Sequence, residues 1–207
     1  VLKDKNAPPL SKRILEMTTL KAIETVDDIE IHSLKSTLTE SGLNFLSMLP
    51  MAKVEVIKKN GVTTACRWQN TKRRFTCPGM PNWVYVGPHK MKSGKTQKSC
   101  IWSHPAKNAT LKIAFPNPPP NSQIYFEHAL STNAVRSDNK SPVVAAIFAD
   151  EAKIKKMSRG NQTGFAATTI NLPSRPTQNL TLEITAKNDG ARHYCFNLKA
   201  KTKETHP

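Results

Sequence analysis

From residue 51 to residue 200 the chain repeats one pattern, in which short segments of alternating apolar and polar residues are separated by Pro, Asn and Gly. In residues 111–115 and 180–184 every second side chain is apolar, which places one face of a strand on a core and the other in water. The turn Lys59-Asn60-Gly61, between two alternating segments, is the strongest hairpin signal in the chain. These segments predict an all-β fold, an antiparallel β-sandwich rather than a set of βαβ units.

About ten short strands are expected, which is typical of a sandwich. The segments are residues 53–56, 62–68, 75–77, 83–86, 100–103, 111–115, 124–130, 143–149, 165–170, 180–186 and 193–199.

The first 50 residues follow a different pattern. Residues 11–24 carry apolar side chains near helical spacing and predict a helix, whereas residues 27–50 fit either a capped helix or a strand. The apolar stretch at 43–49 is expected to pack on another part of the chain. The expected organisation is a helical or mixed N-terminal extension (1–50), a disulfide-tied β-sandwich (51–200) and a disordered tail (201–207).

The four cysteines indicate two disulfides and hence an oxidising compartment, since the even count has no CxxC motif and wide spacing. A hairpin through residues 70–74 would bring Cys66 to Cys77 and leave Cys100 to reach Cys195. The alternative is four reduced, buried cysteines. The compartment implied by disulfides is the periplasm, the cell surface or the extracellular space.

The chain begins with Val1 rather than Met, so any signal or anchor is expected upstream of it. No apolar stretch approaches the roughly 20 residues that a transmembrane helix needs, so no transmembrane segment is expected within the sequence.

The charge is strongly positive and unevenly placed. The chain has 31 Lys and Arg against 15 Asp and Glu, a net charge of +16, and residues 51–100 carry much of the excess. Such a surface attracts anions in general, although solvated lysines on turns would give the same composition. Nucleic acid is disfavoured as a partner, because aromatic residues make up only 6% and mostly lie inside the expected strands.

No motif of a hydrolase, a nucleotide-binding loop or a metal centre is present, so no catalytic residue, metal ligand or cofactor is expected. The carboxylate–imidazole groupings are Glu127 with His128, and Asp189 with His193. Neighbours on a strand point to opposite faces, so Glu127 and His128 are expected not to share a site.

The tryptophans divide into two kinds. Trp68 and Trp102 each follow a cysteine by two residues, which favours burial against a disulfide. Trp83, after Pro81-Asn82, is the tryptophan expected to be exposed.

Several stretches carry a resemblance to a known family: "CIWSHPAKNATLKIAFPNPPP", "IYFEHAL", "PVVAAIFADEAKI", "NQTGF" and "LTLEITAKNDGARHYCFNL". In this order they resemble jelly-roll modules related to galactose-binding-like and NPCBM-type carbohydrate-binding domains. The stretch "CRWQNTKRRFTCPGMPNWVYVGPH" looks like a disulfide-tied extension of bacterial cell-envelope proteins. The resemblance implies a jelly-roll sandwich, an extracytoplasmic location and no catalysis. The chain departs from that family at Asp150-Glu151-Ala152, where an Asp-Gly turn is usual, and lacks an acidic calcium cluster.

The resulting hypothesis is a non-catalytic, extracytoplasmic module that binds carbohydrate or an anionic envelope polymer, such as an acidic polysaccharide, through a loop-rim site and a basic surface. The alternative is a structural or interaction domain of a membrane-anchored envelope assembly, with residues 1–50 docking on a protein partner. The candidate ligand-binding residues are Trp83, His104, Glu127, His128, Asp189, Arg192 and His193.

Overall fold

The computed structural model describes residues 2–3, 20–26, 29–34 and 42–202, and the chain divides into two compact units at residue 42. In the first unit, β1 (Leu2–Lys3), β2 (Leu20–Val26) and β3 (Ile29–Leu34) form an antiparallel sheet in the order β1-β3-β2. The helix expected over residues 11–24 is wrong for residues 20–24, because β2 pairs with β3 along this stretch. Residues 11–19 lie outside the described residues.

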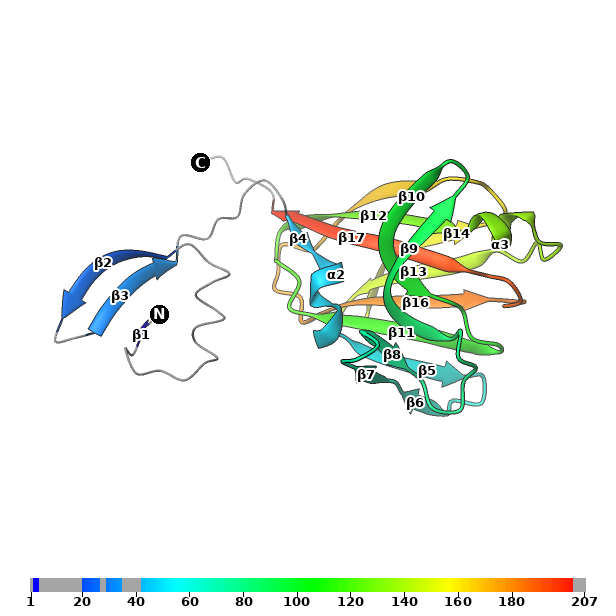
Figure 1. Cartoon of the computed structure of the whole chain (residues 1–207), viewed down its shortest axis with the longest axis horizontal. Helices are drawn as coiled ribbons and strands as arrows, with labels where there is room; N and C mark the ends of the chain where they lie inside the picture. Colours follow the sequence, from blue (N-terminus) through cyan, green and yellow to red (C-terminus); the bar gives the residue numbers. More distant parts are fainter. Residues whose placement is uncertain (1, 4–19, 27–28, 35–41, 203–207) are drawn as a thin grey trace. The chain divides into compact units, whose positions relative to one another are not determined.

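The second unit is a β-sandwich of two antiparallel sheets (Figure 1), which confirms the fold class. The eight-stranded sheet has the order β15-β12-β17-β10-β9-β8-β7, with β4 also paired to β17. Its strands are β4 (Leu43–Asn44), β7 (Arg67–Gln69), β8 (Arg74–Thr76), β9 (Tyr85–Ser93), β10 (Thr96–Ser103), β12 (Ser122–Leu130), β15 (Ala166–Asn171) and β17 (Tyr194–Thr202). The six-stranded sheet has the order β14-β13-β16-β11-β5-β6. Its strands are β5 (Lys53–Lys58), β6 (Thr63–Ala65), β11 (Ala109–Pro116), β13 (Val143–Ala149), β14 (Ala152–Arg159) and β16 (Asn179–Ala186).

The core lies between the two sheets and follows from the alternation in the sequence. Leu111, Ile113 and Phe115 on β11 are fully buried, while the residues between them are only partly covered. Phe45 on α2 (Phe45–Met48) and Leu49 on η1 (Leu49–Met51) join the same core. The apolar stretch at 43–49 therefore packs on the sandwich, as expected, and belongs to its unit rather than to the N-terminal one.

Each strand expected after residue 51 overlaps a strand of the structure, with two differences. The segment at 62–68 is divided between β6 and β7, because the chain passes from one sheet to the other at Cys66. The edge strand β14 was not expected, because its lysines interrupt the alternation of apolar and polar residues. Lysines are common on edge strands. At the C-terminal end, β17 continues to Thr202, and residues 203–207 lie outside the described part.

Both disulfides have the expected pairing. Cys66–Cys77 ties the crossing between the sheets, and Cys100–Cys195 links β10 to β17. Two disulfides are typical of proteins that fold in an oxidising, extracytoplasmic compartment. Within the described ranges, no helix combines the length and the apolarity that a membrane span requires.

Candidate functional site

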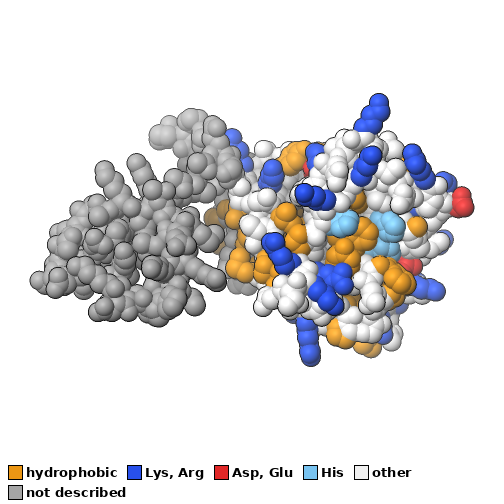
Figure 2. All heavy atoms as spheres, in the orientation of Figure 1, with side chains coloured by type: hydrophobic (Ala, Val, Ile, Leu, Met, Phe, Trp, Pro, Cys, Tyr) orange, Lys and Arg blue, Asp and Glu red, His pale blue; other side chains and the backbone are white. Residues whose placement is uncertain are grey.

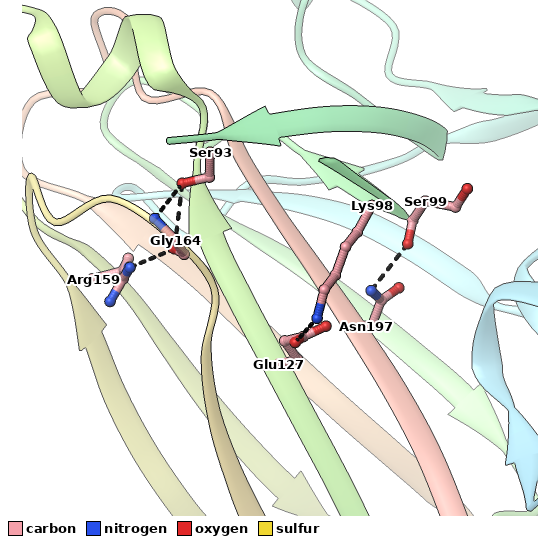
Figure 3. Close-up of polar contacts among 7 residues, drawn as sticks. All are labelled: Ser93, Lys98, Ser99, Glu127, Arg159, Gly164 and Asn197. Carbon is pink, nitrogen blue, oxygen red and sulfur yellow. Dashed lines mark hydrogen bonds and ion pairs between the residues drawn. The ribbon is translucent and has the colours of Figure 1, made fainter. Parts of the chain in front are cut away.

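The hairpin of β9 and β10 leaves the plane of its sheet. β10 pairs with β9 over its whole length, but it pairs with β17 only at Ile101–Phe196 and Trp102–Cys195. The rest of the hairpin crosses the outer side of β17 and β12, the side that faces away from the sandwich core (Figures 1 and 3). It covers a second apolar cluster there, made of Met91, Trp102, Ala129 and the Cys100–Cys195 disulfide.

Polar contacts hold the hairpin against this outer face (Figure 3). Lys98 forms an ion pair with the buried Glu127 of β12, and the Asn197 side chain donates to the Ser99 carbonyl at 3.0 Å. At the hairpin tip, the Gly164 backbone N–H donates to Ser93 Oγ at 2.9 Å. The Gly94 N–H donates to Thr132 Oγ1 at 3.1 Å, so the tip is fixed to α3 (Thr132–Arg136) as well.

A hollow of about 510 Å³ lies between the hairpin, Trp102 and α3, and we call it the Trp102 pocket. Most of the residues that line it belong to three kinds that suit a polar ligand with apolar faces. They are the ring residues Trp102, His89 and His193, the hydroxyl and amide residues Ser131, Thr132 and Asn133, and the basic residues Lys90, Lys92 and Arg136, with Met91 and Gly94 completing the lining. None of the described residues that line it is acidic.

Trp102 is the centre of a ring cluster on this face. Its indole stacks on Tyr85 with centroids 5.5 Å apart, and it contacts His89 at 4.8 Å and His193 at 5.4 Å. Its Nε1–H donates to the Trp83 carbonyl at 3.2 Å. Because Trp102 is only 8% exposed, the rings offered to a ligand are chiefly those of His89 and His193.

The imidazoles of the cluster are neutral near pH 7. Burial lowers the pKa of His89, His104 and His193, and for His193 the neighbouring His104 and Arg192 lower it further. The positive potential of the pocket therefore comes from the exposed Lys90, Lys92 and Arg136, whereas each neutral imidazole offers one donor and one acceptor. Figure 2 shows histidines grouped on this side with hydrophobic surface beside them and Lys and Arg around them.

Three of the sequence-predicted residues, Trp83, His104 and His193, contact Trp102, although only His193 lines the pocket itself. The His104 ring lies 5.8 Å from His193, and Asp189 acts on His104 by raising its pKa against the effect of burial. Trp83 contacts Trp102 through its main chain and is 57% exposed, which confirms the expectation for this tryptophan.

Glu127 and His128 lie elsewhere, on opposite faces of β12 as expected. Glu127 is held under the hairpin by Lys98, and His128 points into the core, where its Nδ1 lies 2.8 Å from the Tyr194 hydroxyl. Both are buried, and neither lines the Trp102 pocket.

Arg192 is fully buried, so its guanidinium positions the rim of the pocket rather than facing solvent. Nη1 donates to Asn161 Oδ1 at 2.6 Å, and Nη2 donates to the Ala134 carbonyl and to Ser137 Oγ at 2.6 Å each. Alternation explains the difference from the expectation, because Arg192 shares the inward side with Tyr194 whereas His193 shares the outward side with the disulfide.

His89, Lys90, Lys92 and Arg136 were not among the residues expected to bind a ligand. The lysines stand out in the sequence as part of a basic block, and Trp102 stands two residues from His104. Arg136 gives no such signal, because α3 has only five residues and no helical period. Among the described residues, no group of three or more His, Cys, Asp or Glu is placed to hold a metal ion.

No protein-family model matches the chain, and no curated protein does. Among solved structures, the K1 cleaved adhesin domain of Lys-gingipain from Porphyromonas gingivalis W83 is similar over 73% of this chain and 91% of that chain, with 12% identity and a TM-score of 0.44. The CBM51-2 and INT domains of Clostridium perfringens ZmpB are similar over 54% of this chain, with 9% identity and a TM-score of 0.37. This chain covers 25% of that structure. A family 35 carbohydrate-binding module from Clostridium thermocellum is similar over 57% of this chain and 88% of its own, with 13% identity and a TM-score of 0.34.

Most of the similar structures are carbohydrate-binding modules, the class that the sequence resembles. Likeness at this level of identity and TM-score carries no functional argument.

Proposed function

We propose that the chain is a non-catalytic, extracytoplasmic binding module that recognises an acidic carbohydrate at the Trp102 pocket. The observation that carries this proposal is the lining of the pocket, whose residues combine imidazole and indole rings, hydroxyl and amide groups, and three basic residues without an acidic one. The periplasm, the cell surface and the extracellular space all fit the two disulfides.

Each kind of side chain matches one part of an acidic sugar. The C–H faces of a pyranose pack on aromatic rings, and its hydroxyls exchange hydrogen bonds with Ser131, Thr132, Asn133 and neutral imidazole. A carboxylate or sulfate group on the sugar is bound by charge-assisted hydrogen bonds from Arg136, and the exposed Lys90 and Lys92, which alternate with His89 on β9, add attraction at longer range. The larger hollow of about 800 Å³ on the six-stranded sheet fits such a ligand less well, because it has no aromatic side chain and contains Glu55, Asp150 and Glu151.

The test is calorimetric titration of the full chain with oligosaccharides derived from heparin and from polygalacturonate. Arg136→Ala is expected to weaken binding by about tenfold or more, since a hydrogen bond to a charged group contributes about 1.5–3 kcal/mol. The matched control is Arg175→Ala, which removes the same charge from an exposed arginine at the other hollow. Equal losses in the two variants would show that only net charge matters and would contradict the proposal.

The separate N-terminal unit favours a second candidate, an interaction domain of an envelope assembly that docks on a protein partner through residues 1–50. If the first proposal holds, a chain without residues 1–42 binds the acidic oligosaccharide with unchanged affinity. If neither the full chain nor the chain without residues 1–42 binds any oligosaccharide, the result contradicts the carbohydrate-binding module and favours the interaction domain.

A further inference from the structure

The Trp102 pocket is one end of a row of side chains that crosses four neighbouring strands. His193 precedes β17, Trp102 lies on β10, Tyr85 on β9 and Arg74 on β8. Trp102 pairs with Cys195 on one side and with Gly87 on the other, and His193 and Tyr85 are each two residues from those partners. All four side chains therefore share the outer face of the eight-stranded sheet.

Arg74 is fixed at the far end of this row. Its guanidinium carbon lies 4.5 Å from the Tyr85 ring centroid, in a cation–π contact. This position depends on Gly87, since a Cβ at residue 87 would lie only 2.6 Å from Cβ of Arg74. Arg74 is partly exposed, and within residues 42–202 it forms no ion pair with an acidic side chain.

Trp83 lies two residues before Tyr85 in the chain and is one of the exposed large hydrophobic side chains of the sandwich. Its main chain is anchored by the hydrogen bond from Trp102 Nε1. The loop that carries it is held at both ends, by the Cys66–Cys77 disulfide before it and by the buried Val84 after it. An exposed indole on such a tethered loop, two residues from Tyr85 in the chain, suits the face of a sugar ring.

We propose that Arg74, Tyr85 and Trp83 form a second subsite for the same ligand, which is therefore the interior of a linear, repeatedly charged polysaccharide rather than a terminal sugar. The inference rests on the proposed function of the Trp102 pocket. The two subsites each supply a cation and a ring, and the mostly buried Trp102 lies between them. Occupying both with one chain raises affinity, because the second contact becomes intramolecular.

The test is a length series with the full chain: heparin-derived di-, tetra-, hexa- and octasaccharides, and the same lengths from polygalacturonate. For at least one polymer, affinity is expected to rise about tenfold or more from the disaccharide to the hexasaccharide. Trp83→Ala, a change at an exposed side chain, and Arg74→Gln are each expected to reduce that rise while leaving disaccharide affinity within about twofold. Tyr125→Ala is the control, because Tyr125 is an exposed aromatic residue outside the row.

A statistical gain, which any longer oligosaccharide has, would persist in Trp83→Ala and Arg74→Gln, whereas a gain from the second subsite would fall in both. Tyr125→Ala is expected to keep the full rise. If the rise persists in both Trp83→Ala and Arg74→Gln, or if the wild type shows no rise, the second subsite is refuted while the Trp102 pocket stands. If no oligosaccharide of any length binds, the proposed function fails together with the inference.

Discussion

At the scale of single residues, the sandwich holds buried cationic and titratable side chains whose hydrogen-bond partners are carbonyl, amide and hydroxyl groups rather than carboxylates. Arg159 donates to the carbonyls of Gln162 and Thr163 at 3.2 and 3.1 Å, and Arg192 is bound in a similar way at the rim of the Trp102 pocket. Burial lowers the pKa of His128 to about 4, with a smaller effect from Arg159. Burial also raises the pKa of Tyr194, its hydrogen-bond partner, so this pair is neutral in the folded protein.

His128 therefore makes the folded state sensitive to acid. In the unfolded chain it takes up a proton near pH 6.5, whereas in the folded protein it does so only near pH 4, so stability is full above pH 6.5 and is lost as the pH falls towards 4. This difference corresponds to roughly 3 kcal/mol over the whole interval. Urea unfolding at pH 7.5 and pH 4.5 is expected to show the fall.

The control for this prediction is His128→Gln, which cannot titrate. Its stability is expected to be lower at pH 7.5, because the hydrogen bond to Tyr194 is disturbed, but to fall less on acidification. A part of the fall remains, since burial also lowers the pKa of His89, His104 and His193. An unchanged difference between the two pH values in His128→Gln would contradict the role given to this residue.

At the scale of elements, the hairpin of β9 and β10 builds the pocket, and the Lys98–Glu127 ion pair ties it to β12. Glu127 is buried and Lys98 is partly exposed, so removing the lysine alone leaves a buried carboxylate without its partner. We expect Lys98→Met to lower the free energy of unfolding by about 1–2 kcal/mol, a value reduced for the exposure of the lysine.

A double-mutant cycle measures this coupling. The double variant Lys98→Met with Glu127→Gln is expected to recover most of the lost stability, because no unpaired charge then remains buried at residue 127. Hydrogen exchange of residues 91–99 is expected to speed up in Lys98→Met more than exchange of β11 does. Unchanged exchange in the hairpin would show that the ion pair does not hold it.

The predictability of elements follows their periodicity. Most strands of the sandwich, such as β11 and β13, alternate and were predictable, whereas β14 does not alternate and was missed. The disulfide that closes a hairpin and the exposure of Trp83 after its turn were also predictable. β2 was expected to be helical because pairing with β3 is not visible in its own spacing. The Trp102 pocket depends on how far β10 separates from β17 and on a five-residue helix, and neither property leaves a period in the sequence.

At the scale of the whole molecule, the net charge of +16 explains general attraction to anions, but it does not explain selection among them. Long-range attraction between exposed charges is screened within about 8 Å at physiological salt. A pocket that also packs rings against a sugar and donates directed hydrogen bonds retains part of its affinity when this attraction is screened. Salt dependence therefore distinguishes a shaped site from a basic surface.

The most direct test of the central claim is a glycan array, with neutral glycans, acidic polysaccharides, peptidoglycan fragments and DNA, probed at low salt and at about 0.5 M salt, where the screening length is only a few ångströms. We predict binding to one family of acidic glycans that weakens with salt but persists, and that is lost in Arg136→Ala. Binding to every polyanion, DNA included, that disappears at high salt would contradict the account, and so would the absence of any bound glycan.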